Sequence, residues 1–262
     1  MSKIVLEIDG PVGIVTLNNP EKHNAFDDVL IADLTAAFAS LDTNKTVRAV
    51  IISAAGKSFS AGADLNWMKR MAGYSPKENL RDATALGKLM STLHGLSKPT
   101  IARVHGAALG GGVGLVACCD IAVGSFAATF SLSEARLGLI PAVISPYVIA
   151  AIGERAAHRY FLTAERFDAA EAYRLGLLHE IASDDEAMDQ KINDLLTALL
   201  SCGPRAISEG KKLIAAVANR PIDDDVVADT AQRIARVRAS AEGKEGVAAF
   251  LEKRKASWVA ES

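Results

Sequence analysis

Hydrophobic residues switch between strand-like and helix-like spacing throughout the first two thirds of the chain. Short runs rich in β-branched residues at 4–8 and 14–17 flank the turn-forming pair Asp9-Gly10 and predict a β-hairpin. The continuous apolar run at 47–53 predicts a buried strand. Between these runs, apolar residues recur at helical spacing over 30–41, and Asp27 precedes them as a candidate helix cap.

The same alternation continues beyond the first strands. Ser75-Pro76-Lys77-Glu78 has the composition of a capping box with proline at the first helical position, and it predicts a helix that ends near residue 96. Three further strands are expected, at 100–105, 120–123 and 129–132. Alternating strands and helices of this kind are typical of an α/β core.

The last third of the chain is mostly helical in its spacing. Asp168 and Gly176 mark the start and the stop of one helix, and only helices are expected after Pro204. We therefore expect an α/β core over residues 1–200 and a helical C-terminal region over 201–262. The apolar faces of the terminal helices exceed what one subunit needs, which predicts a homo-oligomer.

Composition narrows the class of protein. The 262 residues are 50% hydrophobic and 23% charged, as in ordinary globular proteins. A net charge of −2 and 5% aromatic residues provide neither a basic stripe nor stacking platforms for a nucleic acid. No apolar stretch is long enough to span a membrane, and we expect the protein to have no signal peptide, because Met1-Ser2-Lys3 runs straight into a strand-like segment. Adjacent Cys118 and Cys119 fit reduced, buried thiols, so we expect a cytoplasmic protein; no metal-ligand spacing appears.

A glycine-rich turn, from His105 to Gly114, joins the expected strand at 100–105 to an apolar segment. It does not match the dinucleotide motif GxGxxG in any register. Glycine lets the backbone approach a ligand closely, and the first N–H groups of a helix lack internal partners, so such a turn can hold an oxygen that becomes anionic during a reaction. A tight turn needed only for packing explains the same residues, and the turn alone does not decide between the two.

Further motifs extend the evidence along the chain. They are Asn18-Asn19-Pro20-Glu21-Lys22-His23-Asn24-Ala25, Lys57-Ser58-Phe59-Ser60-Ala61-Gly62-Ala63-Asp64-Leu65, Phe130-Ser131-Leu132-Ser133-Glu134, Leu137-Gly138-Leu139-Ile140-Pro141 and the stretch 245–254. Together with Gly110-Gly111-Gly112 they resemble the enoyl-CoA hydratase/isomerase (crotonase) superfamily over nearly the whole chain. The resemblance implies a spiral of ββα units, a helical trimerisation region, trimers or dimers of trimers, and an acyl-CoA thioester substrate. It implies no metal or redox cofactor, since CoA is part of the substrate.

The resemblance also implies roles for individual residues. The backbone N–H groups of Ala63 and Gly111 would polarise the thioester carbonyl, and Glu134 would handle the proton. The residues that would contact CoA are Lys22, Ala25 and Ala61 along the adenine and pantetheine path, Asp64, Leu65 and Asn66 beside it, and Phe250 and Lys253 of the tail, either from the same subunit or from a neighbouring one. Trp67 and Met71 are expected to form a wall of the acyl pocket. Lys69 and Arg70 are expected to be solvated, with pairing of one of them to a second carboxylate of the substrate as the alternative.

One position departs from the pattern. Many hydratases of this superfamily carry two glutamates that hold the water; the second matches Glu134, whereas the first falls on Gly114. A single carboxylate leaves room for a Δ3–Δ2 enoyl-CoA isomerase. A narrower likeness over 112–120 and 138–148 resembles the bacterial methylglutaconyl-CoA and γ-carboxygeranoyl-CoA hydratases, which share this glycine and act in leucine and terpene breakdown. The expected reaction is therefore hydration of a branched 2-enoyl-CoA, with isomerisation as the alternative and RNA binding as a third hypothesis.

Overall fold

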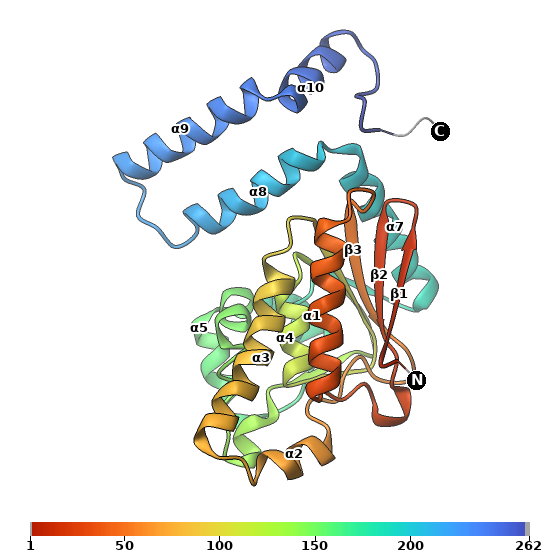
Figure 1. Cartoon of the computed structure of the whole chain (residues 1–262), viewed down its shortest axis with the longest axis vertical. Coiled ribbons are helices and arrows are strands. Elements are labelled where there is room, and N and C mark those ends of the chain that lie inside the picture. The colour runs from red at the N-terminus through yellow and green to blue at the C-terminus, as the bar shows by residue number, and fades with distance from the viewer. Residues whose placement is uncertain (1, 260–262) are drawn as a thin grey trace.

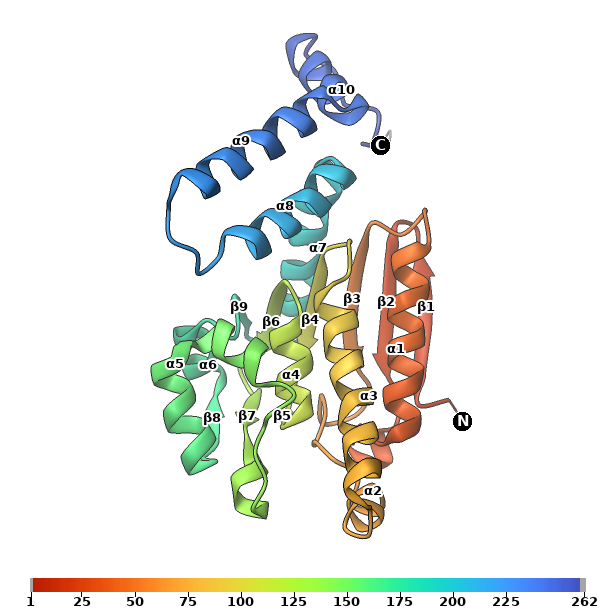
Figure 2. The ribbon, with the colours of Figure 1, turned by 60° about the vertical axis from the view of Figure 1, so that its left-hand side comes forward.

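The computed structural model describes residues 2–259, so Met1 and the last three residues of the expected 201–262 region lie outside it. Its strands form two sheets (Figures 1 and 2). The larger sheet has the order β1-β2-β3-β4-β6-β9 and is parallel except for the β1–β2 hairpin. The smaller sheet has the order β5-β7-β8. The strands are β1 Ile4–Asp9, β2 Val12–Leu17, β3 Ala49–Ala54, β4 Thr100–Val104, β5 Ala107–Leu109, β6 Ile121–Ser125, β7 Thr129–Ser131, β8 Phe167–Asp168 and β9 Glu180–Ala182.

Helices cover both faces of the larger sheet. Helices α1, α3 and α4 lie side by side over one face and enclose the main hydrophobic core, while α7 packs on the other face (Figure 2). The helices are α1 Asp28–Thr43, α2 Leu65–Met71, α3 Pro76–His94, α4 Gly111–Cys118, α5 Ser145–Thr163, α6 Ala169–Leu175, α7 Asp185–Ser201, α8 Pro204–Val217, α9 Asp224–Ala239 and α10 Ala241–Leu251, with short 3₁₀ turns η1 Pro20–Lys22 and η2 Ser133–Leu137. This arrangement confirms the expected α/β class.

Most predicted elements appear close to their expected limits. Asp27 caps α1 by accepting a hydrogen bond from Leu30 N, and Ser75 forms the predicted capping box with Glu78. Gly176 ends α6 in the left-handed conformation. Three short strands were not predicted: β5 within the glycine-rich turn, and β8 and β9 within the stretch expected to be mostly helical. Strands of two or three residues are too short to show an alternating pattern.

Helices α8, α9 and α10 form an arm that extends away from the core (Figures 1 and 2). Arg48, just before β3, fixes the root of the arm by donating 2.7 Å hydrogen bonds to the carbonyl oxygens of Cys202 and Trp258. Lys211 on α8 pairs with Asp120 at 2.6 Å. The arm presents many exposed apolar side chains to solvent: Ile214, Ile222, Val227, Ile234, Val247, Phe250 and Leu251.

Candidate active site

A cavity of about 590 Å³ opens where α2, α3 and the start of α4 meet the loop that follows η2. Apolar side chains make most of its wall, and Glu134 and Asp82 are the carboxylates among its lining residues. No lysine or arginine is among the lining residues. The cavity is lined by Trp67, Met71, Asn79, Asp82, Ala83, Leu86, Gly111, Glu134, Gly138, Leu139, Ile140, Pro141, Ala142, Val143 and Ile144.

Glu134 lies at the start of η2, and one oxygen of its carboxyl group has no partner. Its Oε2 atom is buried and accepts no hydrogen bond within the part of the chain that the structure describes. Burial raises the pKa of the Glu134 carboxyl above its ordinary value. A Cβ atom at Gly110 would lie 2.9 Å from Glu134 Oε1, so glycine at 110 makes room for this carboxyl. A partly desolvated carboxyl with one unpartnered oxygen is suited to proton transfer.

Gly111 is the first residue of α4 and also lines the cavity. The residue before it, Gly110, has a φ of +49° and offers no side-chain cap to the helix. Gly110 N donates to Ser131 O at 2.9 Å, which ties the turn to β7. Among residues 2–259, Gly111 N–H donates to no acceptor. The turn thus presents a free helix-terminal amide beside the cavity that holds Glu134.

The loop that carries Ala63 forms β-bridges with two other segments. Ser60 forms an isolated bridge with Ala108 of β5, and Ser60 O accepts a hydrogen bond from Leu109 N at 2.8 Å. On the other side, Ala63 bridges Phe26 in parallel fashion. The first bridge holds the loop against β5, the strand that leads into α4, and the second joins the loop to the segment that contains Phe26.

The parallel bridge leaves the amide of Ala63 unused. Phe26 N donates to Gly62 O at 2.6 Å, and Phe26 O accepts from Asp64 N at 2.8 Å. These bonds use the groups on either side of Ala63, and its own N–H donates to no acceptor in the described part of the chain. A Cβ atom at Gly111 would lie 3.2 Å from the Phe26 ring. Residues 63 and 111 therefore both adjoin Phe26, and each has a free amide.

Asp64 and Lys22, two expected CoA contacts, form an ion pair with each other. Asp64 caps α2, because its Oδ1 accepts hydrogen bonds from Asn66 N and Trp67 N, while Oδ2 lies 2.9 Å from Lys22 Nζ. The Lys22 ammonium is the largest cause that lowers the pKa of Asp64. The other expected contacts nearby differ in exposure: Ala25 is buried, Ala61 partly buried, and Leu65 and Asn66 exposed.

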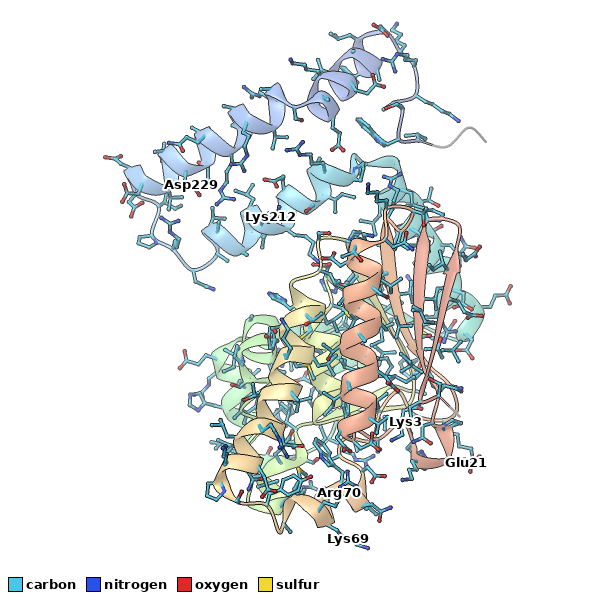
Figure 3. All side chains as sticks on the ribbon, in the orientation of Figure 1. Lys3, Glu21, Lys69, Arg70, Lys212 and Asp229 are labelled. Carbon is cyan, nitrogen blue, oxygen red and sulfur yellow. The ribbon has the colours of Figure 1, made fainter. Side chains whose placement is uncertain are left out.

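Trp67 is buried and lines the cavity, as does Met71. The Trp67 indole donates from Nε1 to Asp82 Oδ1 at 3.2 Å, which joins α2 to α3. Arg70, one helical turn beyond Trp67, pairs with Asp28 at 2.6 Å, and both side chains are about half exposed. Figure 3 shows Lys69 and Arg70 at the end of the molecule opposite the C-terminal arm.

Of the expected site residues, Glu134, Gly111, Trp67 and Met71 line the cavity, and the others do not. Those outside the lining are Ala63, the expected CoA contacts Lys22, Ala25, Ala61, Asp64, Leu65 and Asn66, and also Gly114, Phe250 and Lys253. Gly114 is buried in α4, where a Cβ atom would lie 2.3 Å from Cγ2 of Ile144. Phe250 is 82% exposed on α10, and Lys253 follows that helix. Figure 1 places α10 at the opposite end of the molecule from α2, so one subunit does not bring Phe250 and Lys253 to its own cavity.

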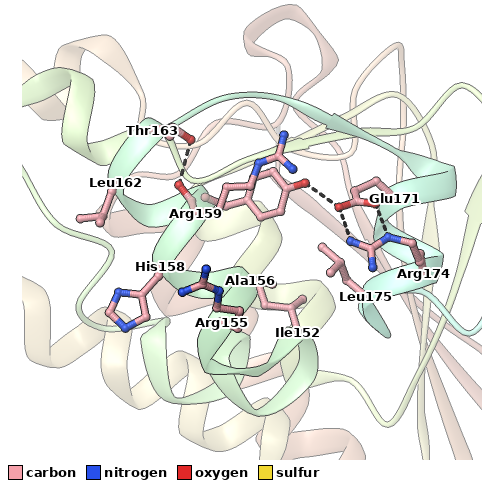
Figure 4. Close-up of a pocket in the computed structure, with 11 residues that line it drawn as sticks. Ile152, Arg155, Ala156, His158, Arg159, Leu162, Thr163, Glu171, Arg174 and Leu175 are labelled. Atoms are coloured by element: carbon pink, nitrogen blue, oxygen red, sulfur yellow. Dashed lines mark hydrogen bonds and ion pairs between the residues drawn. The ribbon is translucent and has the colours of Figure 1, made fainter.

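A second cavity, of about 640 Å³, lies between α5 and α6 (Figure 4). Its charged side chains are largely committed to one another. Arg174 forms two hydrogen bonds with Glu171, and Tyr160 donates its hydroxyl to the same carboxylate at 2.8 Å. Arg159 pairs with Glu165 at 2.6 Å. The charged groups of the second cavity are therefore explained by the ion pairs that they form. Glu134 Oε2 in the first cavity has no such partner.

Sequence reasoning missed Asp82 and Ile144 as cavity residues. On α3, the lining residues Asn79, Asp82, Ala83 and Leu86 follow the i, i+3, i+4, i+7 spacing of one helix face. That face of α3 mixes polar and apolar residues. This mixture is the sequence signal that could have identified the face as part of the cavity wall. Ile144 lies in the run 138–148 that carries the narrower likeness, but no local signal distinguishes it from its neighbours in that run.

Comparisons with known proteins cover the whole fold. A family model described as enoyl-CoA hydratase/isomerase matches residues 7–261. The short-chain-enoyl-CoA hydratase of Clostridium acetobutylicum is 30% identical over 260 residues, which cover 97% of each chain. A crystal structure of an enoyl-CoA hydratase from Shewanella pealeana is 45% identical, with a TM-score of 0.95 over 98% of this chain and 96% of that one. AtuE of Pseudomonas aeruginosa is 36% identical, with a TM-score of 0.91 over 98% and 100%. These likenesses confirm the expected ββα spiral with its helical C-terminal region.

Proposed function

The chain belongs to the enoyl-CoA hydratase/isomerase (crotonase) family, and from this we propose that it is a hydro-lyase that adds water to the C2=C3 bond of a 2-enoyl-CoA to give a 3-hydroxyacyl-CoA. The observation that carries the proposal is the Glu134 carboxyl, which has one buried, unpartnered oxygen and lies in one cavity with Gly111. The amide of Gly111 is unused, and so is that of Ala63, which also adjoins Phe26.

The chemistry follows from where charge develops. Attack of water at C3 moves electrons through the conjugated system onto the thioester oxygen. Two fixed N–H donors, from Ala63 and Gly111, stabilise that oxygen as the enolate forms, and the loss of one such donor costs about 3–4 kcal/mol in the barrier. Glu134 accepts a proton from the water as the C3–O bond forms and delivers that proton to C2 as the enolate collapses, which returns the carboxylate to its starting state. The product has gained one hydroxyl at C3 and one hydrogen at C2.

The CoA part of the substrate would lie along the loop 61–66. We propose that Lys22, Ala25, Ala61, Asp64, Leu65 and Asn66 border it, without a metal or redox cofactor. Phe250 and Lys253 would reach the site of a neighbouring copy in a trimer or dimer of trimers. The exposed apolar side chains of the arm support this assembly, because burial between subunits would remove them from water.

For the acyl group, we propose a branched, methylglutaconyl-type chain of leucine or isoprenoid breakdown. The run Pro141-Ala142-Val143-Ile144, which carries the sequence likeness to such hydratases, lines the cavity. Arg70 follows Trp67 by one helical turn and is the candidate to exchange its exposed Asp28 partner for a second substrate carboxylate. The alternative is an isomerase that moves a proton from C2 to C4, which a single Glu134 could also perform because Gly114 supplies no second carboxylate.

An absorbance assay distinguishes these possibilities. A hydratase consumes the conjugated 2-enoyl chromophore, whereas an isomerase given a 3-enoyl-CoA produces it. We expect loss of the chromophore with 2-enoyl thioesters, and a preference for glutaconyl-type over crotonyl-type substrates that R70A reduces. Chromophore gain from 3-enoyl-CoA without hydration would replace the proposal by the isomerase. An unchanged preference in R70A would remove Arg70 from the acyl site.

A further inference from the structure

Ile144 is only 2% exposed to solvent, and it lines the cavity that contains Glu134. We propose that Ile144 is the residue that determines which acyl groups fit the site, because its immobile side chain closes the inner end of the cavity. The proposal rests on the acyl-CoA site proposed above.

The backbone of Ile144 is fixed by the start of α5. Its carbonyl oxygen accepts hydrogen bonds from Tyr147 N and Val148 N, both at 3.1 Å. Pro146 stands in the first turn of this helix and further restricts the backbone there. A wall residue attached to a rigid helix start cannot move aside to admit a larger substrate group.

The side chain of Ile144 is also blocked from behind. A Cβ atom at Gly114 would lie 2.3 Å from Ile144 Cγ2 and 2.9 Å from Ile144 Cβ, and 3.2 Å from Cε of the buried Met90. Gly114 has ordinary helical geometry, so the demand for glycine is one of space and not of backbone conformation. Ile144 therefore occupies the volume beside α4 that any side chain at position 114 would need.

The neighbouring wall residues differ from Ile144. Leu139 and Ile140 also line the cavity, but they are 54% and 77% exposed and can shift toward solvent. Discrimination between acyl groups requires a wall that does not yield, and one methylene more or less in such a pocket changes kcat/KM by about 10–200-fold. Among these three residues, only Ile144 meets that requirement.

The first experiment compares I144A with I152A. Ile152 is a buried isoleucine on the same helix α5 that does not line this cavity, so I152A controls for lost core packing. With 2-enoyl-CoA substrates that carry a methyl or a larger branch at C3, we expect I144A to raise the kcat/KM ratio in favour of the larger branch by about tenfold or more. I152A should leave the ratio unchanged. An equal ratio in I144A and the native protein would overturn the proposal.

Binding of saturated acyl-CoA, measured by calorimetry, separates this inference from the proposed reaction. A shift of acyl preference in I144A without any hydration in the native protein would retain Ile144 as the selecting residue and reject the hydratase.

A double-mutant cycle with G114A adds a second readout. G114A alone should force Ile144 into the cavity and weaken binding of branched acyl-CoA, and it should do so less in the I144A background. Strictly additive effects would contradict the contact between positions 114 and 144.

Discussion

At the scale of single residues, Glu134 illustrates a conflict between stability and chemistry. Burial raises the pKa of its carboxyl in the folded chain above the value in the unfolded chain. Between those two pKa values, the folded chain binds the Glu134 proton more tightly than the unfolded chain does. The free energy of unfolding therefore falls as pH rises through that window. Above the folded pKa the cost of a buried, ionised carboxylate is fully present.

We therefore predict opposite effects of E134Q on activity and stability. Turnover should fall by about 10²–10⁴-fold, because the proton carrier is lost. The melting temperature should rise at neutral pH and match that of the native protein below the unfolded pKa of glutamate, about 4.3. The kcat/KM of the native protein should rise with pH as Glu134 ionises, and the midpoint of this rise should lie above the unfolded pKa. Rate measurements and thermal melts across pH test both effects.

E154Q serves as the control for this prediction, because the Glu154 side chain is 85% exposed on α5 and does not line the cavity. It should change neither the rate nor the pH dependence of stability. If E134Q had the same melting curve as the native protein at every pH, burial would not be the cause of the raised pKa. Nearly full turnover in E134Q would assign the proton transfer to another group.

The sequence was most informative at residues that lie within local motifs. Glu134, Ala63 and Gly111 each belong to a short run whose pattern could be read directly, and the structure places Glu134 and Gly111 in one cavity. Asp82 lies in no such run, and the run 138–148 that contains Ile144 does not show what Ile144 contacts. Asp82 meets Trp67 across two helices, and Ile144 meets Gly114 across about thirty residues of intervening chain, so their roles depend on tertiary packing.

At the scale of elements, α2 depends on Asp64. This seven-residue helix holds Trp67 and Met71 against the cavity, and it is too short to be stable by helix propensity alone. Asp64 both caps the helix and pairs with Lys22, so the two contributions can be separated. Asparagine caps a helix as well as aspartate does but carries no charge.

We predict that D64A is less stable than D64N by about 1 kcal/mol in the free energy of unfolding, because only D64N retains the cap. D64N should lose only the ion pair, whose Lys22 end is half exposed and therefore contributes little. Urea unfolding at neutral pH measures both values. Equal losses in the two variants would show that the cap does not stabilise α2.

Caps and apolar spacing explain why so many helices were predictable. The Asp27 cap, the Ser75–Glu78 capping box and the Gly176 stop each act within four residues of the helix end they define. The missed strands β5, β8 and β9 are defined by partners far along the chain: β9 exists because β6 offers it an edge. Pairing of that kind leaves no local pattern in three residues.

At the scale of the whole molecule, the arm carries two expected CoA contacts away from the cavity of its own chain. Phe250 and Lys253 lie on or just after α10, and the arm's root is held by Arg48 rather than by the core around Glu134. If these residues act, they act on a neighbouring copy. In solution we therefore expect a mass that is a multiple of three times 27.6 kDa.

Mixed oligomers test this arrangement directly. K253A alone should raise KM for the acyl-CoA, and E134Q alone should lower kcat. When the two variants are unfolded and refolded together, some sites combine native Glu134 from a K253A chain with native Lys253 from an adjacent E134Q chain. Because both groups then serve one site, the mixture should be more active at low substrate concentration than the average of the separate variants. Activity equal to that average would show that Lys253 does not serve the site of a neighbouring copy.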